Sequence, residues 1–275
     1  PAGMEAARVA ASRGHHVTLL ERQSQLGGLL PLAVMVKGTD TEDILSYLEY
    51  LRNQLDVLGV DVQLGRAAGP ADLATARPDA VIVATGGKYQ MPDVPGISRS
   101  IVTGAGDLAR KAKQSLRFVG PRVTRAATKL YLPFGKRVIV IGARIEGVET
   151  AEFLIKRGRA VTIVDTADSF GLGMPERLLM RLRVWLQERE TPIHLGVRLE
   201  EVTDDGLHLV TSDGRRRFLE ADDIVVALPQ VPDTTLADAI ATTAPDVRHI
   251  GPPPTGEPWL IVDAVAAGFR VAKSV

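Results

Sequence analysis

Residues 138–147, Val-Ile-Val-Ile-Gly-Ala-Arg-Ile-Glu-Gly, decide the fold of this chain. A short β-branched run leads into a glycine turn and then into helix-forming residues that end near Gly158. A second apolar run follows at residues 161–164, with Asp165 at its tip. Strand, glycine turn, helix, strand and acid in this order are typical of a dinucleotide-binding βαβ unit, in which glycines let the backbone approach a pyrophosphate and the acid accepts from ribose hydroxyls.

The same pattern opens the chain, displaced by a constant 147 − 3 = 144 residues. The matched positions are Gly3, Glu5, Ala7, Gly14, Val17, Thr18 and Glu21 in the first copy and Gly147, Glu149, Ala151, Gly158, Val161, Thr162 and Asp165 in the second. Two copies in the same order favour two dinucleotide-binding folds over a sheet whose glycines serve only tight turns. The counterpart of residues 138–142 falls before Pro1, so we expect the first strand and first glycines of copy one on a longer polypeptide.

Composition limits the chemistry available to the 275 residues. Lys+Arg 33 and Asp+Glu 33 leave a net charge of zero, which argues against a nucleic-acid or polybasic membrane binder. The chain has no cysteine, so it offers no disulfide, thiolate metal site or iron–sulfur cluster, and its five histidines lack metal-ligand spacing. No apolar run approaches the ~20 residues of a membrane span, and the expected location is cytoplasmic. Redox chemistry therefore requires a bound cofactor.

The second copy departs from the usual glycine pattern at Arg144, which stands where the middle glycine is expected. A Cβ at that position crowds a pyrophosphate, whereas the guanidinium is able to clamp a phosphate bidentately. Weakened nucleotide binding and a phosphate clamp therefore both stay open. Gly142 and Gly147 keep the glycines on either side.

Several segments resemble a known family. These are residues 1–7 (Pro-Ala-Gly-Met-Glu-Ala-Ala), Glu21-Arg22, residues 26–28 (Leu-Gly-Gly), residues 84–87 (Ala-Thr-Gly-Gly), and the connector stretches 116–121 and 132–137. The chain resembles the C-terminal FAD/NAD(P)-binding region of the old-yellow-enzyme-like iron–sulfur flavoenzymes, which include 2,4-dienoyl-CoA reductase, 2-enoate reductase and trimethylamine dehydrogenase. The resemblance covers nearly the whole chain.

The resemblance implies an α/β fold of two Rossmann-like domains, one inserted in the other and truncated at its N-terminus. Residues 1–90 and 236–275 would form a split FAD domain, 91–132 a connector, and 133–235 the inserted NAD(P) domain. It further implies an FMN-binding barrel with a 4Fe-4S cluster upstream, which would hold the small-molecule substrate. A homo-oligomer is left open.

Site residues follow from the same resemblance. Gly3 is expected as the last glycine of the FAD motif, with Glu21 at the adenosine ribose. The remaining FAD positions are Arg22, Gly28, Leu29, Thr85, Gly86 and Gly251, and the NAD(P) positions are Gly142, Arg144, Gly147 and Asp165. Glu21 also reads as a solvated strand end, and Gly27-Gly28 as a simple turn. Relatives carry an aspartate after the glycine at the position of Gly251, but here Pro252 follows, and proline supplies neither a carboxylate nor an N–H.

The connector is rich in basic residues, with Lys111, Lys113, Arg117, Arg122, Arg125 and Lys129 around Phe118 and Tyr131. A helix face that docks on another domain is favoured over an RNA-binding arm because the net charge is zero.

Two functions therefore compete. The first is the electron-transfer part of a flavoenzyme that passes electrons from NAD(P)H through FAD to the barrel, which reduces an activated C=C bond. The second is a non-catalytic structural or nucleotide-sensing subunit with degenerate cofactor sites. No residue of the chain is expected to act as a catalytic acid, base or metal ligand.

Overall fold

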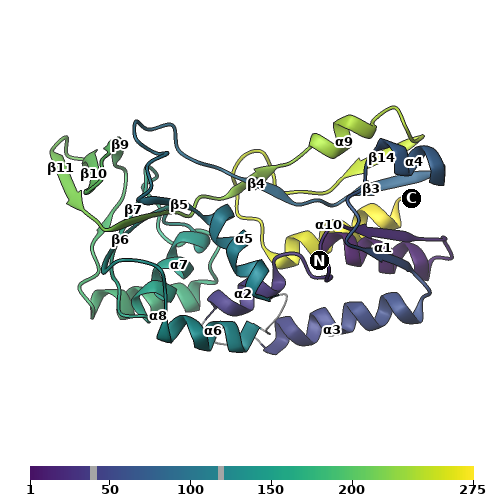
Figure 1. Cartoon of the computed structure of the whole chain (residues 1–275), viewed down its shortest axis with the longest axis horizontal. Coiled ribbons are helices and arrows are strands. Elements are labelled where there is room, and N and C mark those ends of the chain that lie inside the picture. Colours follow the sequence, from purple (N-terminus) through teal and green to yellow (C-terminus); the bar gives the residue numbers. More distant parts are fainter. Residues whose placement is uncertain (38–41, 117–120) are drawn as a thin grey trace. The chain divides into compact units, whose positions relative to one another are not determined.

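The computed structural model describes residues 1–37, 42–116 and 121–275, without the side chains of 113–116 and 122. The chain forms two compact units (Figure 1). Unit 1 consists of Pro1–Val34, Thr39–Lys88 and Gln230–Val275, and unit 2 of Met35–Gly38 and Tyr89–Pro229. Unit 2 is thus inserted in unit 1, and the connector segment belongs to unit 2.

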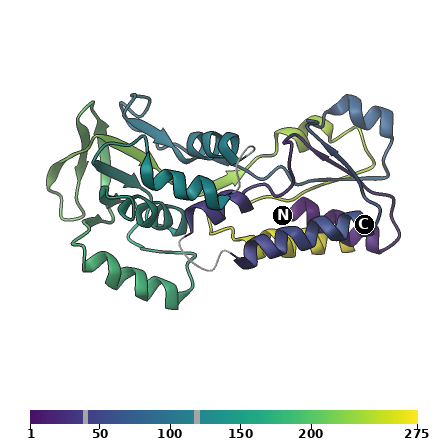
Figure 2. The same cartoon turned by 60° about the horizontal axis from the view of Figure 1, so that its bottom comes forward.

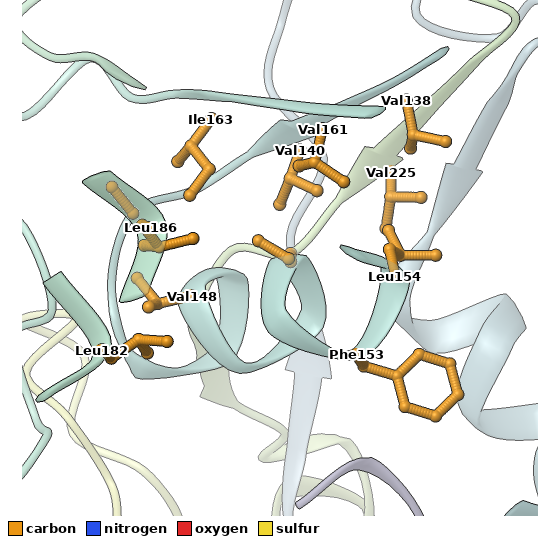
Figure 3. Packing of buried hydrophobic residues seen from close by; sticks show 13 residues of the cluster. Val138, Val140, Val148, Phe153, Leu154, Val161, Ile163, Leu182, Leu186 and Val225 are labelled. Atoms are coloured by element: carbon orange, nitrogen blue, oxygen red, sulfur yellow. The ribbon is translucent and has the colours of Figure 1, made fainter. Parts of the chain in front are cut away.

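Unit 2 is built on a parallel sheet of five strands in the order β5-β12-β6-β7-β8. The decisive run forms the central strand β6 (Arg137–Ile141), between β7 (Ala160–Val164) and β12 (Asp223–Val226). The edges are β5 (Val102–Gly104) and β8 (Ile193–His194). Helices α7 (Ile145–Ile155) and α8 (Glu176–Gln187) bury Val148, Leu154, Leu182 and Leu186 against one face (Figure 3). A strand buried on both faces explains the unbroken apolar run.

The other face of this sheet packs on a three-stranded antiparallel sheet of β9 (Arg198–Val202), β10 (Gly206–Val210) and β11 (Arg216–Glu220). Strands β10 and β11 form a hairpin around residues 212–214, and β9 pairs with the other side of β10. Helices α5 (Ala105–Leu116) and α6 (Pro121–Leu130) complete unit 2. Arg117 and Phe118, two residues of the predicted basic connector, lie outside the described residues, as do the side chains of Lys113 and Arg122.

Unit 1 contains two pairs of parallel strands, β1 (Thr18–Glu21) with β2 (Asp61–Leu64), and β3 (Ala80–Val83) with β14 (Asp246–His249). On one side lie α1 (Ala2–Ser12), α3 (Glu42–Val57) and α10 (Ile261–Lys273), and on the other α4 (Pro70–Ala76) and α9 (Thr235–Ile240) (Figure 2). Thr41, which directly precedes α3, lies outside the described residues.

Three short elements complete the chain near the points where it passes between the units. Helix α2 (Leu30–Val36) follows the Gly27-Gly28 turn. Strands β4 (Gly87–Tyr89) and β13 (Gln230–Pro232) pair with each other. The α/β class predicted from the sequence is confirmed, and none of the described helices has the length and apolar character needed to cross a membrane.

Candidate functional site

In unit 1, two predicted FAD residues lie around the start of α1. A Cβ added to Gly3 would lie 3.2 Å from the Ala84 Cβ, so the first turn of α1 packs on the residue that follows β3. A Cβ on Gly28 would lie 3.3 Å from the Pro1 Cδ. Gly28 also has φ +58, a left-handed conformation that favours glycine. Two backbone positions at the start of α1, Gly3 and Gly28, therefore carry no side chain.

A second close contact lies beyond the ends of β3 and β14, where Gly251 approaches Gly86. A Cβ on Gly251 would lie 3.3 Å from the Gly86 carbonyl oxygen and 2.7 Å from the His249 Cε1. Pro252 is buried, and its Cγ would lie 2.7 Å from a Cβ on Gly87. The position that carries an aspartate in the resembled family is therefore filled by a packed proline, and no carboxylate follows Gly251.

The other predicted FAD residues of unit 1 differ in how firmly the structure holds them. They are Glu21, Arg22, Leu29 and Thr85. Glu21 is half-buried at the end of β1, and its Oε1 accepts a hydrogen bond of 2.8 Å from the Gln23 N–H. Arg22, Leu29 and Thr85 are exposed. A fixed carboxylate at the strand tip suits ribose hydroxyls, and exposed side chains are open to a ligand.

These features fit an anionic dinucleotide. The first-turn N–H groups of a helix have no intrahelical acceptor and carry partial positive charge, and Gly3 and Gly28 lie at the start of α1. Glu21 lies at the tip of β1, the strand that follows α1. Unit 1 therefore has donors for a pyrophosphate and an acceptor for a ribose, whereas the aspartate lost at Pro252 has no replacement next to Gly251.

In unit 2, two glycines allow α7 to pack closely on the end of β6. A Cβ on Gly147 would overlap the Gly142 carbonyl oxygen, and a Cβ on Gly142 would overlap the Ala227 carbonyl oxygen. Gly142 also has φ +121. Helix α7 begins after Arg144, whose extended backbone forms the N-cap. Both outer glycines of the predicted motif are thus required by the backbone itself, whether or not a nucleotide binds.

Asp165 has a role that the sequence did not reveal. It is buried, and its Oδ2 accepts from the Ala143 N–H at 2.6 Å while its Oδ1 accepts from the Ala167 N–H at 2.9 Å. The segment after β7 adds a hydrogen bond of 3.0 Å from the Ile145 N–H to the Leu172 carbonyl. The carboxylate at the end of β7 thus holds the glycine turn in place through the Ala143 N–H. It lies next to the position where the ribose of NAD(P)H is predicted to bind.

Helix α7 also carries two acidic residues close to the glycine turn. Glu146 Oε2 is buried and has no hydrogen-bond partner among the described residues, and burial raises the pKa of this carboxyl. Burial raises the pKa of Glu149 to about 7, against the opposing charge of Lys37. Lys37 Nζ lies 3.9 Å from Glu149 Oε1. In unit 1 the equivalent acid Glu5 instead receives two hydrogen bonds from Arg8, of 2.8 and 2.9 Å.

The structure therefore groups the predicted residues within each unit. Gly3 and Gly28 flank the start of α1, Gly86 meets Gly251, and Gly142, Gly147 and Asp165 shape one turn. The contacts of Glu5 and Glu149 were missed, although both residues are matched positions of the repeat. Within the described ranges, the side chains form no cluster suited to a metal ion.

Comparison with known proteins agrees with this arrangement. Residues 1–248 match the family described as pyridine nucleotide-disulphide oxidoreductase. An NADH oxidase of Thermoanaerobacter brockii is 31% identical over 276 residues, which are 100% of this chain and 40% of that protein. A cinnamate reductase of Clostridium sporogenes is 29% identical over 281 residues, covering 100% of this chain and 38% of that protein.

A solved structure of 2-naphthoyl-CoA reductase in complex with 2-naphthoyl-CoA superimposes with a TM-score of 0.82 at 27% identity. The match covers 100% of this chain and 38% of that one. The chain thus spans about four tenths of the length of these relatives.

Proposed function

Because the chain belongs to the pyridine nucleotide-disulphide oxidoreductase family, whose fold binds FAD and NAD(P)H, we propose that it is the part of a flavoenzyme that moves electrons from NAD(P)H to FAD. In this proposal the electrons pass on to an FMN- and iron–sulfur-containing barrel that lies outside residues 1–275 and reduces an activated C=C bond of an enoate or enoyl-CoA. The cofactors carry the redox chemistry, and the chain binds and orients them.

The observation that supports the proposal most strongly is the repeat of one βαβ arrangement in two separate units. In unit 1, Gly3, Gly28, Gly86 and Gly251 would leave backbone open to FAD, and Glu21 would accept from its ribose. Arg22, Leu29 and Thr85 would line the same ligand with exposed side chains. In unit 2, Gly142 and Gly147 would admit NAD(P)H beside α7, with Arg144 and Asp165 on either side.

The share of each relative that this chain covers supports a further catalytic part. The NADH oxidase and the cinnamate reductase each carry more than half of their length outside the matched region. A third relative, described as a multifunctional alkene reductase/demethylase of Caballeronia cordobensis, is 41% identical over 96 residues. Reduction of a C=C bond is therefore the substrate chemistry that we propose for the whole protein.

A second function is favoured by two specific residues. Arg144 stands at the middle glycine position, and buried Pro252 replaces the expected carboxylate. If Arg144 crowds the pyrophosphate and the missing carboxylate weakens the hold on FAD, the cofactor sites are degenerate, and a structural or nucleotide-sensing subunit is the alternative.

Anaerobic titration of the purified protein with NADH and NADPH separates the two. The proposal expects a yellow protein that retains FAD and loses its visible flavin absorption when reduced nucleotide is added. A colourless protein that takes up no added FAD establishes the alternative. A protein that binds FAD but is not reduced by either nucleotide limits the function to flavin binding.

A further inference from the structure

Helix α6 of unit 2, labelled in Figure 1, has an apolar side that is exposed. The outward stripe consists of Val123, Ala126, Ala127, Leu130 and Tyr131, all of them exposed. Val123 is 58% exposed, Leu130 93% and Tyr131 76%. The spacing of three, four, seven and eight residues places them on one side of a helix. An amphipathic helix normally buries such a side, and a contiguous exposed apolar patch marks an interaction surface.

The opposite side of α6 is polar and is the side that is fixed to unit 2. Thr124 is buried, and the Thr128 Oγ1 accepts a hydrogen bond of 2.8 Å from the Arg157 Nε. Arg157 is itself held by the Phe153 carbonyl at 2.9 Å, and burial lowers its pKa to about 10. Arg159 Nη2 donates to the Leu132 carbonyl at 2.9 Å. These bonds hold the helix by its polar side, so the outward stripe is a consequence of the fold.

The stretch of sequence that contains the stripe is strongly basic. Between Asp107 and Glu146 the sequence has no acidic residue, and it has ten basic ones: Arg110, Lys111, Lys113, Arg117, Arg122, Arg125, Lys129, Lys136, Arg137 and Arg144. The whole chain is neutral. Since complementary potentials fix the register of an interface, the surface that covers the stripe should carry acidic residues around an apolar centre.

We propose that the outward stripe docks on an acid-rimmed apolar patch of the accompanying part of the protein, the part that relatives carry beyond the region matched here. This inference rests on the proposed function, in which that part accepts the electrons. In five relatives, the region that matches this chain is only 33 to 42% of the full length. Each of them therefore has a large additional part.

The size of the stripe favours this occupant over a membrane surface. Its three large side chains bury little apolar surface, and a small apolar contact of this kind gives only marginal, reversible attachment to a membrane. A partner on the same polypeptide has an effective concentration in the mM range, at which a small contact suffices for docking.

Site-specific photo-cross-linking in the full-length polypeptide tests this docking. Tyr131 is replaced by p-benzoylphenylalanine, and Val57 on α3, which is also 76% exposed, serves as the matched control. We expect Tyr131 to cross-link to peptides outside residues 1–275 at least five times more than Val57 does. Cross-links only to a second copy of residues 1–275, only to added anionic phosphatidylserine vesicles, or at the control level overturn the proposal.

A second variant tests the energetic role of the stripe. Leu130→Glu places a charge on a 93% exposed position, so it should leave the melting temperature of residues 1–275 unchanged. In the full-length polypeptide we expect it to raise amide hydrogen exchange of α6 at least tenfold; unchanged exchange overturns the docking. Flavin reduction by NADH, measured in the same samples, reports separately on the proposed function, because cross-linking from Tyr131 does not depend on it.

Discussion

The two units use one strand order, and they differ at its centre. In unit 2 the order β8-β7-β6-β12-β5 is continuous, and β6 bonds to a strand on each side. In unit 1 the corresponding pairs β2-β1 and β3-β14 form separate ladders, and no strand among the described residues joins β1 to β3. Helix α1 nevertheless packs on both pairs, since a Cβ on Gly3 would lie 3.2 Å from Ala84 Cβ and 4.0 Å from Leu19 Cδ1.

This difference separates two contributions to the fold. Helix packing is enough to bring the two strand pairs of unit 1 to the same helix, because the cores around α1 and α10 draw residues from both pairs. It does not satisfy the backbone groups along the facing edges of β1 and β3, which a central strand would pair. Unit 1 should therefore gain stability from an added strand, whereas unit 2 has no place for one.

The largest predicted effect comes from supplying that strand. A copy of residues 137–144 fused directly before Pro1 restores the spacing that the repeat predicts, and it should insert between β1 and β3. Burial of its four β-branched residues, less the entropy of ordering the segment, should raise the free energy of unfolding by on the order of 4 kcal/mol. Chemical denaturation followed by circular dichroism measures the change.

The matched control is the same fusion with aspartate at the equivalents of Val138 and Val140. It adds the same length but no apolar strand, so it should leave stability at the level of residues 1–275. Equal stabilisation by both fusions, or by neither, would show that unit 1 has no opening for a central strand.

The next effect compares equivalent glycines. In Gly147→Ala the new methyl group overlaps the Gly142 carbonyl oxygen, and the backbone must shift, which should cost about 3 kcal/mol. In Gly3→Ala the methyl group approaches the Ala84 Cβ to 3.2 Å, a contact that a shift of a few tenths of an ångström relieves, and the cost should stay below about 1 kcal/mol. Thermal unfolding of both variants decides; equal costs would mean that the two helices approach their strands equally closely.

A third comparison concerns the equivalent acids Glu149 and Glu5. The pKa of Glu149 is raised to about 7, so the unfolded chain releases this proton first, and its contribution to stability is lost as pH rises from about 4.5 to 7. We expect the fall in the free energy of unfolding over this pH range to be smaller in Glu149→Gln than in the native chain, by on the order of 2 kcal/mol. Glu5→Gln instead breaks the paired hydrogen bonds with Arg8 and should destabilise unit 1 at neutral pH.

The measurement is urea denaturation at several pH values between 4 and 8. Glu149→Gln should give a flatter profile than the native chain, whereas Glu5→Gln should lie below the native profile at neutral pH. A native profile with no slope in this window would show that Lys37 compensates the burial of Glu149 fully.

The fold was largely predictable because periodicity and the repeat are local signals. The run at residues 138–141 predicts a buried strand. The 144-residue offset of the repeat locates the matching helix and strand of the first copy. The double hydrogen bond of Asp165 was not predictable, since it joins residues 22 apart through the backbone of a turn. The outward stripe of α6 was equally hidden, because its spacing alone suggests burial, and only the anchoring of Thr128 by Arg157 shows which side is fixed.

A smaller effect concerns flavin retention. Glu21→Ala removes the acceptor predicted for the adenosine ribose, while it costs the fold only the bond from the Gln23 N–H. We expect roughly tenfold weaker FAD binding, equivalent to about 1.4 kcal/mol, with Glu49→Ala, which removes an exposed carboxylate on α3, as the control for general surface effects. Dialysis followed by flavin fluorescence measures retention, and unchanged affinity in Glu21→Ala would remove this residue from the flavin site.

The smallest expected effect is on the preference for NADH over NADPH. Each unit has an acidic residue at the same position of the repeat, Glu21 in unit 1 and Asp165 in unit 2. A carboxylate at Asp165 accepts from ribose hydroxyls and repels a 2′-phosphate, so the native enzyme should prefer NADH. Asp165→Ala should reduce that preference by severalfold, and Asp165→Asn, which keeps an oxygen acceptor for the Ala143 N–H, separates this charge effect from loss of the turn. Stopped-flow reduction of the flavin by each nucleotide gives the ratio. A native preference for NADPH, or an unaltered ratio in both variants, would leave Asp165 as a support for the glycine turn alone.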